Sequence, residues 1–370
     1  MSSSIENHKT VPEQFTGYAA FSAETWSDLK LHKFTPKPFG DYDIDIKVRY
    51  CGVCGSDLHV LRSGWSPSIY PCVAGHEITG EVICVGPLVT SSSLQPGSIV
   101  GVGSQAWSCG GCDACAGEDI GTKPGDGKDW GAAGEHGHGG EKDGSAGYGG
   151  YADYVRIHEN FVYPIPEGIP EEIVAPMFCG GVTMYSPLRR ANIGPGSKVG
   201  IVGIGGLGHF GILFAKALGA TVTAISHSPR KAADASALGA SQFLSTAAPG
   251  WNAPHLRTLD LIISTNFSTD MPLGEYLSLL KVGGTLVICG IPEGDLPRLS
   301  WADIAAANLA IRGSNVGSKK EIAEMLELVK EKGVKSWVEV VGMKDVEDVV
   351  KRLDRGECRY RYVLKADFEE

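Results

Sequence analysis

The sequence contains no long uninterrupted apolar run of the kind that crosses a membrane. Its most apolar window, residues 199–225, is broken by several glycines, by His209 and by Lys216. An apolar run interrupted in this way is typical of a strand, a turn and a helix rather than of a membrane span. The N-terminus lacks the basic segment and the apolar core of a secretory signal. We therefore expect a cytoplasmic protein with no membrane partner.

Blocks of basic residues are also missing. The chain has 33 Lys and Arg against 43 Asp and Glu, which gives a net charge of -10. Binding to a nucleic-acid backbone needs a basic face, so a nucleic-acid partner is not expected. A small anionic cofactor held by a few local groups is compatible with this charge.

Cysteine is well represented, with ten residues, although no feature points to an oxidising compartment. Under reducing conditions, metal binding or catalysis explains cysteines better than disulfides do. The chain has 370 residues, of which 43% are apolar and 21% are charged. A single core rarely grows to this size, so we expect two domains, each with its own core.

The pattern of apolar residues differs between the two parts of the chain. Residues 15–100 hold short alternating apolar runs broken by Gly and Pro, which predict an irregular, mostly antiparallel β region. From about residue 170, strand-like runs alternate with helical stretches, which predicts an α/β fold with a doubly wound parallel sheet. This change of pattern divides the chain near residue 168, with a β-rich part before it and an α/β domain after it.

A glycine pattern predicts a nucleotide site. Gly203, Gly205 and Gly208 fit G-x-G-x-x-G, with Gly206 and Leu207 between them. The pattern follows strand-forming residues and opens a helix, which is the context that a Rossmann domain requires. Its glycines allow a tight turn and a close approach to a pyrophosphate, and the helix N-terminus attracts the phosphates. The alternative is a glycine-rich turn in another kind of α/β domain.

The second strand of this domain lacks a terminal acidic residue, which in NAD sites binds the ribose 2′-hydroxyl. Ser226, His227, Arg230 and Lys231 follow there instead. A hydroxyl with cationic or imidazole groups binds a 2′-phosphate by charge-assisted hydrogen bonds, so NADP(H) is the predicted cofactor. A solvated basic loop is the alternative.

Candidate metal ligands are scattered along the chain. Cys51 and Cys54 are spaced like a redox or zinc motif, while His76 and Cys179 lie much farther on. A catalytic zinc needs thiolate and imidazole ligands and one open position. Cys54, His76 and Cys179 supply this set only if the fold brings them together, and their spacing leaves that question open.

Several segments together resemble one family. They are CGVCGSDLH at 51–59, G-H-E-x-x-G-x-x-x-x-x-G-x-x-V at Gly75–Val89, CGGVTMYSPL at 179–188, VGIGGLGHFG at 202–211 and GSKKE at 317–321. The chain is similar to zinc-dependent medium-chain dehydrogenases/reductases of the cinnamyl-alcohol-dehydrogenase-like branch, especially fungal NADP-dependent alcohol dehydrogenases. This resemblance implies a GroES-like catalytic domain at 1–168, completed by 318–370, and a Rossmann domain at 169–317, with the active site in the cleft between them. It also implies an oxidoreductase that interconverts alcohols and aldehydes with Zn²⁺ and NADP(H).

The resemblance also implies roles in the zinc site. Cys54, His76 and Cys179 would bind the catalytic zinc, and Glu77 would be an alternative ligand. Asp57 would orient His76. A zinc ion held in this way polarises a carbonyl or lowers the pKa of a bound alcohol.

Other roles implied by the resemblance concern proton transfer and the cofactor. Ser56 and His59 would relay the alcohol proton to solvent, although local capping by Ser56 and a solvated His59 are the alternative. Thr183, Gly317 and Ser318 would contact the cofactor.

The four cysteine ligands of a second, structural zinc in this family follow the spacing C-x2-C-x2-C-x7-C. Cys109, Cys112 and Cys115 match the first three positions, but Lys123 stands at the fourth. Either the lobe holds no zinc or another group completes the site, and the candidates are Glu118, Asp119, His136 and His138. We expect a weak or absent structural zinc.

The substrate is expected to be apolar or aromatic, because Trp65 and Trp107 are placed to line a pocket, with ordinary core packing as the alternative. Aldehyde reduction is the expected direction, and the resemblance implies a homodimer through Rossmann edge strands. Two other functions stay open: an NADPH-dependent reductase of an iminium or activated C=C bond, and a nucleotide-binding protein without catalysis. The presence of both Ser56 and His59 favours alcohol and aldehyde chemistry over the iminium or C=C reductase.

Overall fold

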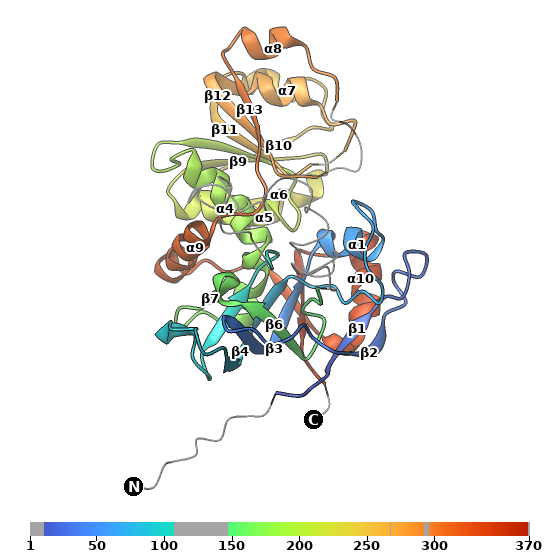
Figure 1. Ribbon diagram of the computed structural model, residues 1–370. Helices are drawn as coiled ribbons and strands as arrows, with labels where there is room; N and C mark the ends of the chain where they lie inside the picture. The colour runs from blue at the N-terminus through green and yellow to red at the C-terminus, as the bar shows by residue number, and fades with distance from the viewer. Residues whose placement is uncertain (1–10, 107–146, 267, 292–294, 296, 369–370) are drawn as a thin grey trace. The chain divides into compact units, whose positions relative to one another are not determined.

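The computed structural model of the protein describes residues 11–106, 147–266, 268–291, 295 and 297–368 (Figure 1). The chain forms two compact units. Unit 1 comprises Met1–Cys179 and Trp337–Glu370, and unit 2 comprises Gly180–Ser336. Within the part of the chain that the structure describes, no helix is both long and apolar enough to span a membrane.

The units divide the chain about ten to twenty residues later than the boundaries drawn from the sequence, at 179/180 and 336/337. Packing explains the difference. Helix α3 (Glu171–Val174) and the 3₁₀ turn η3 (Ala175–Phe178) pack on strands of unit 1, whereas α9 (Lys319–Lys332) packs on α4 (Gly180–Arg190) in unit 2. Alternation of strand and helix along the sequence does not reveal which sheet a short connecting helix covers.

Unit 1 is built on a seven-stranded sheet with the order β14-β15-β3-β4-β5-β7, in which β6 also pairs with β3. Its strands are β3 (Asp43–Val53), β4 (Glu77–Val85), β5 (Ile99–Val102), β6 (Tyr154–His158), β7 (Val162–Pro164), β14 (Val338–Gly342) and β15 (Arg361–Lys365). A separate pair is formed by β1 (Phe15–Ala19) and β2 (Lys30–Phe34). All these pairings are antiparallel except β14 with β15. This is the mostly antiparallel body that the sequence predicts.

The core of unit 1 follows from the strand pattern. Ile44, Ile46 and Val48 recur at every second position of β3 and are fully or nearly fully buried. Around this sheet lie α1 (Gly55–Leu61) and α10 (Val346–Asp354). The remaining 3₁₀ turns of unit 1 are η1 (Ser92–Leu94), η2 (Glu159–Phe161) and η6 (Met343–Asp345).

Unit 2 is a six-stranded sheet in which every pairing is parallel. Its strands are β8 (Lys198–Val202), β9 (Thr221–Ser226), β10 (Gln242–Ser245), β11 (Leu259–Ser264), β12 (Leu280–Ile288) and β13 (Ala310–Gly313). Their spatial order is β10-β9-β8-β11-β12-β13. Counted from β8 this order is 3-2-1-4-5-6, the order of a Rossmann dinucleotide-binding domain. The predicted fold class is therefore confirmed for both units.

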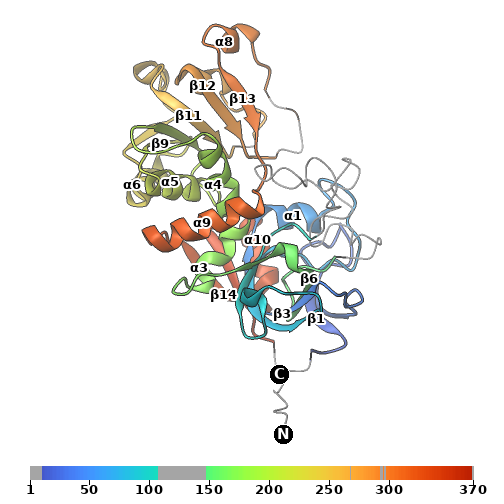
Figure 2. The ribbon, with the colours of Figure 1, turned by 60° about the vertical axis from the view of Figure 1, so that its left-hand side comes forward.

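Helices cover the sheet of unit 2. Besides α4 and α9 they are α5 (Gly208–Ala217), α6 (Ala232–Leu238), α7 (Leu273–Ser278) and α8 (Trp301–Ala305), with 3₁₀ turns η4 (Pro229–Lys231) and η5 (Ala253–His255). Helices α5 and α6 lie side by side (Figure 2), with α5 against β8 and β9 and α6 against β10. Residues of α7 share a buried cluster with Val202, Ile225 and Ile262 of the central strands.

Two glycines of unit 1 set the position of the segment that ends at Cys179. The ring of Phe178 lies directly on Gly101 of β5, so closely that a Cβ there would overlap it, and the carbonyl of Phe178 lies over Gly103. Phe178 itself is almost completely buried. Because close packing leaves no space for adjustment, these contacts fix the chain at the residue before Cys179.

We predict that Gly101→Ala destabilises the protein by about 1–3 kcal/mol, because the added methyl group displaces the Phe178 ring. Chemical denaturation followed by fluorescence measures the change in the free energy of unfolding. Gly194→Ala is the matched control, since a Cβ at Gly194 meets no atom within 4 Å. Equal losses in the two variants would contradict the packing role of Gly101.

Candidate metal centre and nucleotide site

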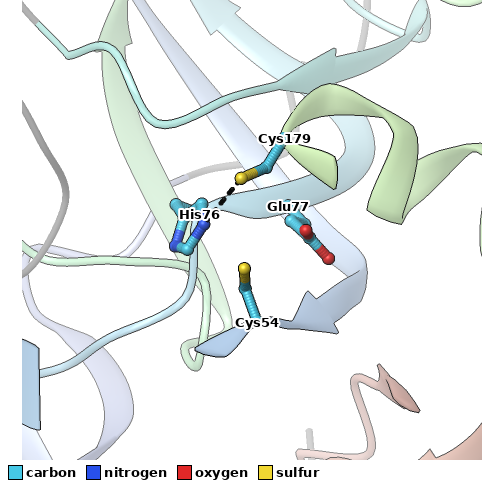
Figure 3. A group of neighbouring side chains, drawn as sticks. All are labelled: Cys54, His76, Glu77 and Cys179. Carbon is cyan, nitrogen blue, oxygen red and sulfur yellow. Dashed lines mark hydrogen bonds between the residues drawn. The ribbon is translucent and has the colours of Figure 1, made fainter. Parts of the chain in front are cut away.

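Four buried side chains converge within unit 1 (Figure 3). Cys54, His76, Glu77 and Cys179 each offer a ligand atom, and these atoms all lie within 4.8 Å of one another. Figure 3 shows the two thiols and the imidazole pointing towards a common centre, with the Glu77 carboxylate beside them. The structure thus brings together the candidate ligands that their spacing in the sequence could not place.

Strand pairing explains how these residues meet. Gly52, near the end of β3, is paired with Glu77, the first residue of β4. A Cβ at Gly52 would overlap the Glu77 carboxyl group, so glycine is required for the close approach. Cys54 follows as the N-cap of α1 and His76 immediately precedes β4. The two chain segments therefore deliver their ligands to the same end of the sheet.

The carboxylate of Asp57 orients the imidazole. Asp57 is fully buried, and its Oδ1 accepts hydrogen bonds from His76 Nδ1 at 2.8 Å and from Gly75 N at 3.1 Å. Its Oδ2 accepts from Cys54 N and from the Tyr151 hydroxyl, each at 2.8 Å. With Nδ1 donating to a carboxylate, Nε2 is left to face the centre, where it lies 3.2 Å from Cys179 Sγ. Such a partner fixes the tautomer of a metal-binding histidine.

Arg361 of β15 lies against Glu77, and sequence reasoning missed it. Both side chains are buried, and the guanidinium donates a hydrogen bond to Glu77 Oε1. Burial raises the pKa of Glu77 to about 7, and the positive charge of Arg361 opposes that rise. No motif links residues so far apart in the chain, so no sequence signal could have found this contact.

The electrostatic environment favours a thiolate at Cys54. The hydrogen bond with Cys179, followed by the charges of Arg361 and His76, holds the pKa of the Cys54 thiol well below its usual range despite burial. Zinc binds thiolates, imidazoles and carboxylates, which are the chemical groups assembled here. The donor set therefore fits a catalytic zinc ion, with residues held in place by the chain's own hydrogen bonds.

The predicted relay residues lie on α1, next to the metal centre. The Oγ of Ser56 lies 3.7 Å from Cys54 Sγ. His59 is one turn further along, half-buried, and its ring stacks on Trp65 with centroids 4.4 Å apart. The structure thus places Ser56, His59 and Trp65 together, and their roles in proton transfer and substrate binding stay predictions.

The predicted structural-zinc lobe falls outside the described residues. This applies to Cys109, Cys112 and Cys115, to Lys123 and the four alternative ligands, and to Trp107 of the predicted substrate pocket. The expectation of a weak or absent second zinc stays a prediction.

The glycine loop of unit 2 has the features that a pyrophosphate requires. Gly203 has φ +85°, a conformation that favours glycine, and a Cβ at Gly208 would overlap the Gly203 carbonyl. A Cβ at Gly205 would meet no atom within 4 Å, so the loop is open at that point. Helix α5 begins directly after Leu207. A glycine turn that opens a helix in this way is the arrangement that binds an anion in other dinucleotide sites.

The end of β9 carries the groups predicted to bind a 2′-phosphate. Ser226 closes the strand, which is the neighbour of β8 in the sheet, and His227 and Arg230 are exposed after it. The Lys231 ammonium donates a hydrogen bond to the Ile204 carbonyl, inside the glycine loop. Lys231 therefore lies next to the glycine loop, and His227 and Arg230 belong to the same short segment after β9.

Packing explains part of the motif that contains Gly317 and Ser318. A Cβ at Gly317 would overlap Val182 and Ser186 of α4, and the Ser318 Oγ caps α9 by accepting from Glu321 N at 3.2 Å. Thr183 is buried on α4. Contact of these residues with the cofactor stays a prediction.

Two family patterns cover both units. Residues 40–167 match the alcohol dehydrogenase GroES-like domain, and residues 206–331 match the zinc-binding dehydrogenase domain. The chain belongs to the zinc-dependent alcohol dehydrogenases of the medium-chain dehydrogenase/reductase family, in the cinnamyl-alcohol-dehydrogenase-like branch. The family inferred from the sequence motifs is confirmed.

Individual relatives are similar to this protein in sequence or structure along almost the whole chain. NADP-dependent alcohol dehydrogenase 6 of Saccharomyces cerevisiae is 43% identical over an aligned length of 366, and the match covers 95% of this chain and 97% of that protein. The structure of a cinnamyl alcohol dehydrogenase from Sorghum bicolor is 34% identical with a TM-score of 0.85, covering 96% of this chain and 99% of that one. The corresponding enzyme from Helicobacter pylori, complexed with NADP(H), is 32% identical with a TM-score of 0.85, covering 95% and 98%.

We predict that Asp57→Asn lowers zinc affinity by about 10–100-fold, because the amide no longer fixes the His76 tautomer. Competition with a chromogenic chelator measures this. Tyr151→Phe, which removes one hydrogen bond to Asp57, should give a smaller loss.

The control for this prediction is Asp45→Asn, which alters another buried carboxylate of unit 1 that is bonded to Arg156 instead. It should reduce stability without reducing zinc affinity. Unchanged zinc affinity in Asp57→Asn would refute the orienting role.

Proposed function

We propose that the protein interconverts alcohols and aldehydes by hydride transfer with NADP(H) at a zinc centre, and that it mainly reduces apolar or aromatic aldehydes. The observation that carries this proposal is the buried set of two thiols, an imidazole and a carboxylate, oriented by Asp57. The alcohol dehydrogenases that the chain resembles over almost its full length support the same chemistry.

The chain's own residues prepare this chemistry. A zinc ion in such a site polarises a carbonyl oxygen or lowers the pKa of an alcohol. Cys54 and Cys179 would supply the thiolates that hold such an ion, and His76 presents Nε2 because Asp57 engages its Nδ1. Arg361 places a buried positive charge beside Glu77, which offsets the negative charge that the thiolates and carboxylate bring together.

Helix α1 carries the two residues of the proposed proton pathway. Ser56 lies beside the metal ligand Cys54, and His59 lies on the same helix three residues later. Residues three apart share a helix face, so a proton taken up by the Ser56 hydroxyl has an imidazole acceptor nearby. Because His59 is half-buried, it can pass that proton on to solvent. In aldehyde reduction the same path delivers the proton.

The cofactor is NADP(H). A 2′-phosphate at the end of β9 would meet a hydroxyl and the basic groups of His227, Arg230 and Lys231, and it would meet no carboxylate in the segment Ser226–Lys231. This segment also offers no acidic residue to bind the 2′-hydroxyl of NAD(H). Solved structures with this fold include one bound to NADP(H).

The substrate pocket includes Trp65. Its indole stacks on His59 at an interplanar angle of 14°, so an apolar wall adjoins the proton path. Offset stacking favours flat aromatic rings, which supports aromatic aldehydes as substrates. The contribution of Trp107 rests on the sequence alone.

The functional unit is a cytoplasmic homodimer. Strand β13 is an edge of the six-stranded sheet, and Trp301 and Val282 of the same unit are 79% and 68% exposed. An exposed edge strand and exposed apolar side chains are features that a second copy of the chain can cover. Among the described residues the cysteines are free thiols, which supports a reducing compartment.

We predict that the purified protein oxidises NADPH in the presence of cinnamaldehyde or benzaldehyde, and that a strong chelator or Cys54→Ser abolishes this activity. Loss of a thiolate ligand removes the zinc chemistry while leaving the nucleotide domain intact. The absorbance of NADPH follows the reaction, and NADPH binding to Cys54→Ser serves as the control for folding. NADPH binding without turnover across an aldehyde panel would exclude the proposed reaction, and turnover of an iminium alone would support the reductase alternative.

Arg230→Ala should raise the KM for NADPH by about tenfold or more, because one charge-assisted hydrogen bond to the 2′-phosphate is lost. The KM for NADH should change by less than about twofold, since NADH has no 2′-phosphate. Lys330→Ala, which removes an exposed charge at the far end of α9, is the control. Equal effects on both cofactors would overturn the assignment of Arg230.

A further inference from the structure

Two ion pairs join α4 to α9 in unit 2, and they differ in depth. Arg190 donates to Glu321 through two hydrogen bonds of 2.7 Å, and the Glu321 side chain is completely buried. Arg189 makes an equivalent two-pronged contact with Glu324, whose side chain is 36% exposed. We name Arg190–Glu321 the inner pair and Arg189–Glu324 the outer pair. The chain thus contains two pairs of the same chemistry on the same two helices.

The inner pair is connected to the turn that precedes α9. Glu321 Oε2 accepts a hydrogen bond from Ser318 N at 2.8 Å, while Ser318 Oγ accepts from Glu321 N at 3.2 Å. This reciprocal arrangement is a capping box. Here its carboxylate also binds Arg190, so a single buried group fixes the start of α9, the end of α4 and the backbone of Ser318.

The residue before Ser318 lies directly on α4. A Cβ at Gly317 would overlap Val182 and Ser186, which leaves the turn no freedom to move towards the helix. Thr183 is adjacent to Val182 on that helix and is buried. At its other end the turn is held to the sheet, because Ser314 N donates to the Ile288 carbonyl at 3.0 Å. The place of Gly317 relative to Thr183 therefore depends on the inner pair.

We propose that Arg190 and Glu321 are positioning residues for cofactor binding, which hold the turn 313–318 against α4 so that Thr183 and Gly317 face NADP(H) in a preformed arrangement. This inference rests on the proposed function and on the cofactor contacts that the family resemblance implies for Thr183 and Gly317. Removing one partner of a buried ion pair leaves an uncompensated charge, which is strongly unfavourable, so the intact pair keeps the turn docked. A preformed site binds its ligand more tightly because less ordering accompanies binding.

The outer pair provides the matched comparison. Glu324 lies one turn further along α9 from Glu321, so its loss tests the contact between the helices without altering the cap. The test compares Arg190→Lys and Glu321→Gln with Arg189→Lys and Glu324→Gln in the full-length, zinc-loaded protein. Three quantities are measured for each variant: the Kd of NADPH by fluorescence titration, the KM of the aldehyde, and the melting temperature.

We expect Glu321→Gln to raise the Kd of NADPH about tenfold, which corresponds to one charge-assisted hydrogen bond, and Arg190→Lys to raise it about threefold. The KM of the aldehyde should change by less than about twofold, and the outer variants should leave the Kd within about twofold of the wild type at a comparable change in melting temperature. Arg190→Lys keeps the charge and should have the smaller effect of the inner two.

An inner variant with a lowered melting temperature but an unchanged Kd would show that the pair only stabilises the fold, and would overturn the inference. Equal changes in Kd for inner and outer variants would overturn it as well. Failure of the wild-type protein to bind NADPH would instead refute the proposed function, so the two failures are distinguishable. If Glu321→Gln does not fold, the milder Arg190→Lys decides between these outcomes.

Discussion

The hydrogen bonds accepted by the Asp57 carboxylate hold the metal-binding end of unit 1 together. They come from Cys54, Gly75, His76 and Tyr151, which belong to separate parts of the chain. A buried carboxylate is costly in free energy unless its lone pairs are satisfied, so releasing any of these donors is unfavourable. The geometry of the zinc ligands is therefore a property of the folded chain itself. It also links the start of α1, and hence Ser56 and His59, to the orientation of the imidazole.

The second constraint on the structure is the close packing of other segments against glycine residues, and it recurs in both units. Gly52 admits the Glu77 side chain, Gly101 admits the Phe178 ring, and Gly317 lies against α4. In each case a side chain on one segment occupies the space where a Cβ would lie. The glycines thus set distances between segments that carry candidate metal ligands or residues predicted to contact the cofactor. Their importance comes from packing, because interiors are filled to near crystal density.

The sequence predicts best those features whose physical causes are local. The loop at Gly203–Gly208 was recognisable because the turn, the strand before it and the helix after it are contiguous. Tyr151 and Arg361 were missed because their contacts depend on tertiary pairing, which a single sequence does not encode as a spacing. Glu321 is intermediate, since the S-x-x-E pattern at Ser318 signals a capping box. That pattern does not reveal the partner Arg190.

Strand β15 has a consequence for how the protein is made. It lies between β14 and β3 in the sheet of unit 1 and carries Arg361, yet it is synthesised after all of unit 2. During translation, domains fold as units from the N-terminal side. The contiguous unit 2 can form its sheet on the ribosome, whereas residues 50–53 of β3 in unit 1 must wait for β15 as their partner strand. The contact of Arg361 with Glu77, beside the candidate metal ligands, can therefore form only after the rest of the site has been synthesised.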